Sequence, residues 1–308
     1  MVAGTSTGGI LACLYLKPDP GNSSLPQYAA EDGLKLYMRN GDSIFDVGVW
    51  RRVLGANGLL DEKYSAENLE RLAKKVFGNV TLGQLLKPCL VTAYATQLHR
   101  PFFFKSHNVK TKTSDDYYVR EVVRATSAAP TYFEAAMPDS LDNIPNATPM
   151  IDGGVFANNP AACALVEALT LKSPEFAPLN IGNAPALLGE VAVLSLGTGG
   201  RTQSISHSEC KDWGLVGGAR PIIDILMDGV AQAVDYQLTT LFDSCGKAGQ
   251  YLRVNGDFDD FANSLRIDGL DPAMDNASDK NLKLLERFGK QLAKNHSGQI
   301  ANFVNNYL

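Results

Sequence analysis

Residues 1–16 read MVAGTSTGGILACLYL: a short apolar start, a Gly-x-Ser-x-Gly motif at Gly4–Gly8, and an apolar run. In this motif the serine typically occupies a sharp turn between a strand and a helix, and the glycines allow close approach of neighbouring backbone. We therefore expect Ser6 at such a turn, followed by a buried helix over 7–16, because this segment is apolar almost all round. A strand that leads directly into a helix indicates a layered α/β fold.

Beyond this segment, short runs rich in β-branched and aromatic residues alternate with segments of helical periodicity. The predicted strands lie within residues 88–97, 100–106, 150–154 and 190–200. The predicted helices cover residues 31–39, 64–77, 116–125, 160–171, 221–242 and 278–294. The strand within 190–200 is continuously apolar and ends in glycines, a pattern typical of a parallel strand buried on both faces. No repeat or linker is evident, so we expect one domain.

Composition excludes several classes of protein. The chain has 308 residues and a formal net charge of -5, with no basic block that would indicate nucleic-acid binding. It contains no run of 18 apolar residues, so no membrane-spanning helix is expected. Its five cysteines form no Cys-x-x-Cys pair, which argues against a disulfide framework or a zinc site. Localisation stays open between the cytoplasm and secretion.

Ser6 is a candidate nucleophile because the expected turn would present its hydroxyl at the start of a helix. The helix N-terminus carries partial positive charge and free N–H groups, which suit a developing oxyanion. The N–H of Thr7 is the natural donor. Two alternatives remain at this point, a plain glycine-rich turn and a phosphate-binding loop. The phosphate loop lacks its usual lysine, since Lys17 lies a full helix away.

A serine hydroxyl also needs a base. The four histidines lie in segments that would not hold them rigidly. Asp152 is a better candidate because it ends a short apolar strand and is followed by Gly153 and Gly154, and ligands bind at strand ends in open α/β sheets. The alternative is that Asp-Gly-Gly forms only a turn.

Four segments, taken together and in order, resemble the patatin-like phospholipase family. They are GTSTGGI at 4–10, ATSAAPTYF at 125–133, DGGVFANNPA at 152–161 and SLGTG at 195–199. The stretch DWGLVGGARPIIDILMDGV at 212–230 and YLRV at 251–254 are also similar to the family. The resemblance covers nearly the whole chain.

The resemblance implies a three-layer α/β/α fold with a mostly parallel central sheet, in a single domain over 1–308. It also implies a Ser–Asp dyad without histidine, in which Ser6 is the nucleophile, Asp152 is the base and the N–H of Thr7 is an oxyanion donor. The motif glycines are Gly4, Gly8, Gly153 and Gly154.

The implied activity is lipid acyl hydrolysis, of the phospholipase A or non-specific acyl ester type, without calcium, another metal or a cofactor. The implied partners are a phospholipid or another fatty-acyl ester and a transient membrane or micelle surface. Asn158 and Asn159 would brace the loop after Asp152, and Thr5 and Thr7 would satisfy local backbone groups.

The sequence departs from the family pattern at its start. The family has a glycine-rich loop before the serine that supplies the main oxyanion donors, and no such loop precedes Ser6 in this sequence. We therefore expect a family member that lacks the first strand and this loop, and whose hydrolase activity is weak or absent. Two other hypotheses are a non-catalytic protein with a storage, binding or regulatory role, and a Ser-His-Asp hydrolase that uses His207 or His296.

Overall fold

The computed structural model describes residues 1–44, 65–109, 111–142, 148–171, 188–200 and 219–307 without 268, 272 and 274, together with 207 and 211. Two compact units emerge from the contacts of the chain. The first comprises Met1–Pro160 and Gly214–Met227, and the second comprises Ala161–Trp213 and Asp228–Leu308. Each unit combines helices and strands, so the predicted α/β class is confirmed. The single-domain organisation stays a prediction.

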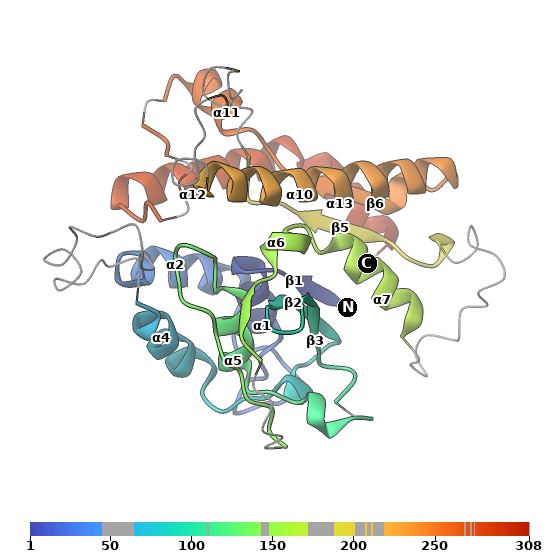
Figure 1. Cartoon of the computed structure of the whole chain (residues 1–308). Helices are drawn as coiled ribbons and strands as arrows, with labels where there is room; N and C mark the ends of the chain where they lie inside the picture. The colour runs from blue at the N-terminus through green and yellow to red at the C-terminus, as the bar shows by residue number, and fades with distance from the viewer. Residues whose placement is uncertain are drawn as a thin grey trace, which may run out of the picture. The chain divides into compact units, whose positions relative to one another are not determined.

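The first unit contains both strands and helices (Figure 1). The strands are β1 (Val2–Gly4), β2 (Cys89–Ala95), β3 (Arg100–Lys105) and β4 (Met150–Asp152). The helices are α1 (Thr7–Leu16), α2 (Ala30–Ile44), α4 (Glu67–Phe77), α5 (Val119–Thr126) and the short α6 (Gly154–Ala157), with single 3-10 turns η2 (Leu82–Gln84) and η3 (Thr113–Asp115).

Strand β2 is the centre of the four-stranded sheet in this unit. Strand β3 pairs with β2 in antiparallel fashion along one edge. On the other edge, β1 runs parallel to β2 and ends with Gly4 opposite Val91, whereas β4 runs antiparallel and ends with Asp152 opposite Ala93. The two strands therefore run toward each other, and their carboxyl ends meet beside the residue between, Thr92.

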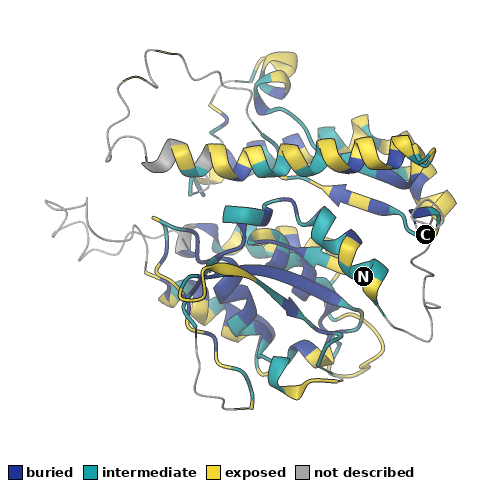
Figure 2. Ribbon diagram, turned by 45° about the vertical axis from the view of Figure 1, so that its right-hand side comes forward, coloured by how far each residue is buried: buried dark blue, intermediate teal, exposed yellow. Residues whose placement is uncertain are grey.

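The core of the first unit lies around β2 and the helices that pack on it. Five residues of α1 are buried, and Ile10, Leu11 and Tyr15 also pack against the core, so the prediction of a helix with contacts all round is confirmed. Strand β2 is buried along almost its whole length, and dark blue marks the buried residues of this unit in Figure 2. Each large apolar side chain buried here contributes roughly 1.5–3 kcal/mol to folding.

Some predicted helix ends differ from the structure. The helix expected from Asp116 begins at Val119, because the Oδ1 atom of Asp116 accepts hydrogen bonds from the N–H groups of Gly83 and Tyr117. That carboxylate therefore fixes a loop and does not cap a helix. Helix α2 continues beyond the predicted end at residue 39. Helix α4 begins at Glu67, later than the predicted start at residue 64, because residues 65 and 66 are not helical.

The second unit contains a two-stranded parallel sheet and several helices. Its strands are β5 (Val193–Leu196) and β6 (Tyr251–Val254). Its helices are α7 (Ala161–Thr170), α11 (Phe258–Leu265), α12 (Asp279–Asn295) and α13 (Ser297–Tyr307), with the 3-10 turn η4 (Ala248–Gln250). Helix α10 (Ala219–Ser244) begins in the first unit and continues into the second.

Strand β5 is parallel, as the sequence predicts, but it is not buried on both faces. Its residues alternate between buried and exposed, and Leu194 and Leu196 are exposed. The prediction that the apolar run over 190–200 forms a strand buried on both faces is therefore wrong.

Within the described residues, no helix has the length and apolarity that crossing a bilayer requires.

Candidate functional site

The turn between β1 and α1 holds Ser6 in an unusual backbone conformation. Ser6 is the N-cap of α1, with φ 53° and ψ -125°. A positive φ is uncommon outside glycine, and such a conformation costs about 1–3 kcal/mol and persists only where the surroundings impose it. The sharp strand-to-helix turn thus lies where the motif predicts it, and it is strained in the way that presents a serine hydroxyl at the end of a strand.

The two glycines that flank Ser6 in the motif have different roles. A Cβ atom at Gly4 would lie 2.1 Å from the carbonyl oxygen of Gly8 and 2.5 Å from the nitrogen of Gly9. No real Cβ tolerates such distances, so the turn requires glycine at this position. A Cβ atom at Gly8 would meet nothing within 4 Å. The expectation that both glycines permit close backbone approach therefore holds for Gly4 alone.

Asp152, the last residue of β4, is fully buried. Its Oδ1 atom accepts a hydrogen bond of 2.7 Å from the N–H of Gly154. Its Oδ2 atom is buried and has no hydrogen-bond partner among the described residues. Burial raises the pKa of Asp152 to about 6, and the Ser6 hydroxyl and the Gly154 N–H act in the opposite direction.

The Ser6 hydroxyl therefore lies close enough to stabilise the Asp152 carboxylate, yet its geometry is not that of a complete hydrogen bond to Oδ2. A hydrogen bond has strict distance and angle requirements, and the contact between the Ser6 hydroxyl and Oδ2 does not meet them. Reacting groups in enzymes without bound substrate often show such loose contacts, which shorten when the substrate binds. The structure thus brings together two residues that are far apart in the sequence.

The glycines after Asp152 allow the chain to pass close to β2. A Cβ atom at Gly153 would lie 2.1 Å from Oγ1 and 2.6 Å from the carbonyl oxygen of Thr92. A Cβ atom at Gly154 would lie 2.6 Å from the end of the flexible Met227 side chain, which can move. Asn158 donates a hydrogen bond of 3.3 Å to the Met227 carbonyl, in line with its expected bracing role.

Thr7 is exposed, and it is the first residue of α1. Helix geometry leaves the first N–H groups without an intrahelical acceptor. The N–H of Gly8 is not available for a ligand, because it donates to the carbonyl of Thr5 at 2.8 Å. Between Thr7 and Gly8, Thr7 therefore has the N–H that is better placed to bind an oxygen anion.

Three threonines contact this turn in a way that the sequence did not reveal. Thr5 was expected to serve local backbone, but its hydroxyl donates to the carbonyl of Ala157, 152 positions away. The Thr126 hydroxyl accepts a hydrogen bond from the Ser6 N–H. Thr92 lies on β2 between the residues that pair with the ends of β1 and β4. A signal existed for Thr92, since it is a polar residue within an otherwise apolar strand, and buried polar residues need an explanation.

The histidines of the alternative hypothesis, His207 and His296, both belong to the second unit. His207 is exposed, and the Nδ1 atom of His296 lies 3.0 Å from the carbonyl of Leu292 at the end of α12. In the described part of the chain, the Ser6 N–H bonds to the Thr126 hydroxyl, and Oδ1 of Asp152 accepts from the Gly154 N–H. No group of three or more His, Cys, Asp or Glu side chains that could hold a metal ion occurs within these described ranges.

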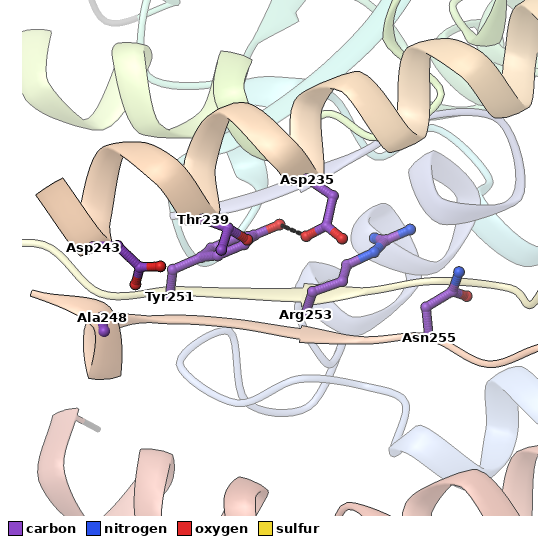
Figure 3. Close-up of a pocket in the computed structure, with 7 residues that line it drawn as sticks. All are labelled: Asp235, Thr239, Asp243, Ala248, Tyr251, Arg253 and Asn255. Atoms are coloured by element: carbon purple, nitrogen blue, oxygen red, sulfur yellow. Dashed lines mark hydrogen bonds between the residues drawn. The ribbon is translucent and has the colours of Figure 1, made fainter.

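A separate cavity of about 330 Å³ lies in the second unit (Figure 3). One stripe of α10 and one face of β6 form most of its wall. The lining residues are Asp235, Thr239, Asp243, Ala248, Tyr251, Arg253 and Asn255.

Several polar side chains that line this cavity form hydrogen bonds with one another or with other residues of the second unit. The Tyr251 hydroxyl donates to Asp235 at 2.7 Å, as the dashed line in Figure 3 marks, and Arg253 donates to the Ser195 hydroxyl at 2.7 Å. Burial raises the pKa of Tyr251 well above its usual value, so this hydroxyl stays a donor. No serine with a neighbouring base lines the cavity, and we assign it no ligand.

Comparison with known proteins covers the segment that contains the turn at Ser6. A sequence profile described as patatin-like phospholipase matches residues 1–165. This stretch is more than half of the chain and includes both Ser6 and Asp152.

Individual relatives align over most of the chain. Patatin-like protein 1 of Arabidopsis thaliana is 28% identical over 315 residues, which cover 97% of this chain and 73% of that protein. Patatin-like protein 1 of Oryza sativa subsp. indica is 28% identical over 305 residues, 94% of this chain and 70% of its own length. The Arabidopsis thaliana protein named "Probable inactive patatin-like protein 9" is 31% identical over 262 residues, 82% of this chain and 63% of its own length.

Proposed function

This chain belongs to the patatin-like phospholipase family, which has a three-layer α/β/α fold and typically hydrolyses lipid acyl esters, and on that premise we propose that it is a lipid acyl hydrolase with a Ser6–Asp152 dyad. The observation that carries the proposal is that β1 and β4 end beside each other on β2, with Ser6 two residues after one strand end and the buried Asp152 at the other. In agreement with this arrangement, the Ser6 hydroxyl lowers the pKa of Asp152 against the effect of burial.

In the proposed mechanism, the Asp152 carboxylate takes the proton of the Ser6 hydroxyl while the serine oxygen attacks the ester carbonyl carbon. The N–H of Thr7 donates to the oxygen that becomes negatively charged. The carbon–oxygen bond to the alcohol breaks, and that alcohol leaves with the proton held by Asp152. Asp152 then takes a proton from water while the water oxygen attacks the acyl-serine carbonyl. The bond to the Ser6 oxygen breaks, the fatty acid leaves, and Asp152 returns the proton to Ser6.

The substrate that we propose is a phospholipid or another fatty-acyl ester at a membrane or micelle surface, cleaved in phospholipase A fashion or with little specificity. Ser6 and Asp152 supply the nucleophile and the base themselves, so the proposed reaction requires no calcium ion. Turnover should accordingly be unchanged when a calcium chelator is added to the assay.

A fluorophosphonate probe tests the proposal directly, because it reacts with activated serines. We expect the folded protein to be labelled, and mass spectrometry to locate the label on Ser6. Ser6→Ala should abolish labelling, whereas Ser24→Ala, which removes an exposed serine of the same unit, should leave it unchanged. Labelling that persists in Ser6→Ala would contradict the proposed nucleophile.

The pH dependence of the reaction follows from the raised pKa of Asp152, about 6. A base must be ionised to accept a proton, so kcat/KM with a soluble short-chain ester should be level above about pH 7 and about half of that level at pH 6. Below that value it should fall about tenfold for each pH unit, as a single essential ionisation requires. A profile that stays level from pH 7 to pH 5 would contradict Asp152 as the base.

A second candidate function is a non-catalytic protein of the same family with a binding, storage or regulatory role. It is favoured by the similarity to a relative whose own name describes it as probably inactive. A well-folded sample that neither reacts with the fluorophosphonate nor hydrolyses fatty-acyl esters would support this second function.

A further inference from the structure

The strained conformation of Ser6 needs an external support, and its own N–H receives one. That N–H donates a hydrogen bond of 2.8 Å to Oγ1 of Thr126, the last residue of α5. Strained backbone persists only where surrounding contacts impose it. The acceptor here is a side chain from another helix, so the turn depends on a residue outside the Gly-x-Ser-x-Gly motif.

Thr126 is itself held in one orientation. It is fully buried, and its hydroxyl donates to the carbonyl of Thr92 at 2.7 Å. A threonine hydroxyl has a single proton. Because that proton is used toward Thr92, the oxygen of Thr126 must act as an acceptor toward Ser6.

The same segment also holds Asp152. Two positions after Thr126, the carbonyl of Ala128 accepts the N–H of Asp152 at 2.9 Å. Residues 126–128 thus accept hydrogen bonds from the backbone N–H groups of both Ser6 and Asp152. This short segment sets how far apart the two residues lie.

A second set of bonds joins the turn to the chain that follows Asp152. The Thr5 hydroxyl donates to the carbonyl of Ala157 at 2.6 Å, so it must accept from the Thr92 hydroxyl at 2.7 Å. Gly153 packs directly on Thr92. One residue of β2 therefore supports both the Ser6 turn and the turn after Asp152.

From these contacts we infer that Thr126 is a positioning residue, aided by Thr5 and Thr92, which keeps the Ser6 hydroxyl within reach of the Asp152 carboxyl. The inference rests on the proposed function, in which these two side chains react together. A displacement of about 1 Å between reacting groups can reduce turnover about 10²-fold. Loss of the Thr126 hydroxyl should therefore affect kcat far more than KM.

The test compares three variants that remain close in shape to the original. Thr126→Val removes the hydroxyl and keeps the branched side chain, and Thr126→Ser restores the hydroxyl. Thr96→Val is the matched control, because the Thr96 hydroxyl also donates to a carbonyl beside β4, that of Pro149 at 3.1 Å, but outside the Ser6 turn. For each variant, kcat, KM, the melting temperature and the pKa of Asp152 by carbon NMR are measured.

We expect Thr126→Val to lower kcat about 10²-fold with KM within about threefold, and Thr126→Ser to recover most of this loss. Thr96→Val should lower the melting temperature without a comparable loss of kcat. The pKa of Asp152 should rise in Thr126→Val, because the Ser6 hydroxyl would stabilise the carboxylate less. Equal kcat losses in Thr126→Val and Thr96→Val, or an unchanged kcat in folded Thr126→Val, would overturn the inference.

The NMR measurement separates this inference from the proposed function. If the wild-type protein shows no Ser6-dependent turnover, the proposed function fails, yet the pKa of Asp152 still reports whether Thr126 holds Ser6 beside it. An Asp152 pKa that is equal in wild type and Thr126→Val, but higher in Ser6→Ala, would overturn the positioning role alone. If Thr126→Val does not fold, Thr5→Val compared with Thr5→Ser applies the same test to the second set of bonds.

Discussion

Asp152→Asn is expected to lose about 10²–10⁴-fold in turnover, the usual contribution of a general base, and at the same time to become more stable above pH 6. Asparagine has nearly the same shape as aspartate and keeps an oxygen to accept the Gly154 N–H. It has no carboxylate to accept the Ser6 proton. Ser6→Ala should lose turnover to a similar or greater extent.

The gain in stability follows from the raised pKa of Asp152. Burial raises this pKa from 3.8 to about 6. Below about pH 4 the carboxyl is neutral in both the folded and the unfolded protein, so it costs nothing to bury. As the pH rises from 4 to 6, the unfolded chain ionises first and the folded state loses stability. A shift of this size corresponds to about 3 kcal/mol. Asparagine avoids this cost.

Chemical denaturation at pH 8 and pH 4 measures this effect. We expect Asp152→Asn to be more stable than wild type at pH 8 by up to about 3 kcal/mol, and the difference to shrink toward zero at pH 4. Ser6→Ala is the control, because it removes activity while it keeps the buried charge, and it should show no such gain. Equal stabilities of Asp152→Asn and wild type at both pH values would show that burying the Asp152 carboxylate does not destabilise the folded protein.

The second large effect concerns the glycines around Ser6. Gly4→Ala should destabilise the protein by at least about 4 kcal/mol or prevent folding, because its Cβ would lie 2.1 Å from a backbone oxygen of α1. Helix α1 would have to move away from β1, and the Ser6 turn would open. Gly8→Ala should keep the stability or raise it by up to about 1 kcal/mol, because its Cβ enters open space and alanine favours a helix.

This pair of variants changes one hydrogen atom to a methyl group at two positions of a single motif. Circular dichroism and urea denaturation of both proteins would measure the difference. A folded Gly4→Ala with wild-type stability would show that the turn can relax. A strongly destabilised Gly8→Ala would show that the space beside it is filled in solution.

Local features of the fold could be predicted from the sequence, because they depend on neighbours in the chain. Helix α1 begins and ends at the predicted residues, since the motif fixes its start and apolar residues cover its faces. Strands β2 and β3 were recognised by their composition. The helix expected from residue 116 was wrong at its start, because a distant glycine binds the carboxylate that would have capped it.

The candidate site could be predicted only in part. The motif identifies Ser6, and the strand end before two glycines identifies Asp152, but periodicity does not state that β1 and β4 share one edge of β2. That pairing is a contact between distant segments. The hydroxyl contacts of Thr126 and Thr92 were missed for the same reason, and the difference between Gly4 and Gly8 depends on what each would touch. The roles of Ser6 and Asp152 stay predictions.

The pairing of β4 with β2 means that hydrogen-bond register is itself a requirement for the proposed chemistry. Successive side chains of a strand point to opposite faces of a sheet. A slip of β4 by a single position would therefore turn the carboxyl of Asp152 to the reverse side and leave the Ser6 hydroxyl facing a residue with no acid group. The backbone hydrogen bonds between β4 and β2 thus decide whether the two oxygens can exchange a proton.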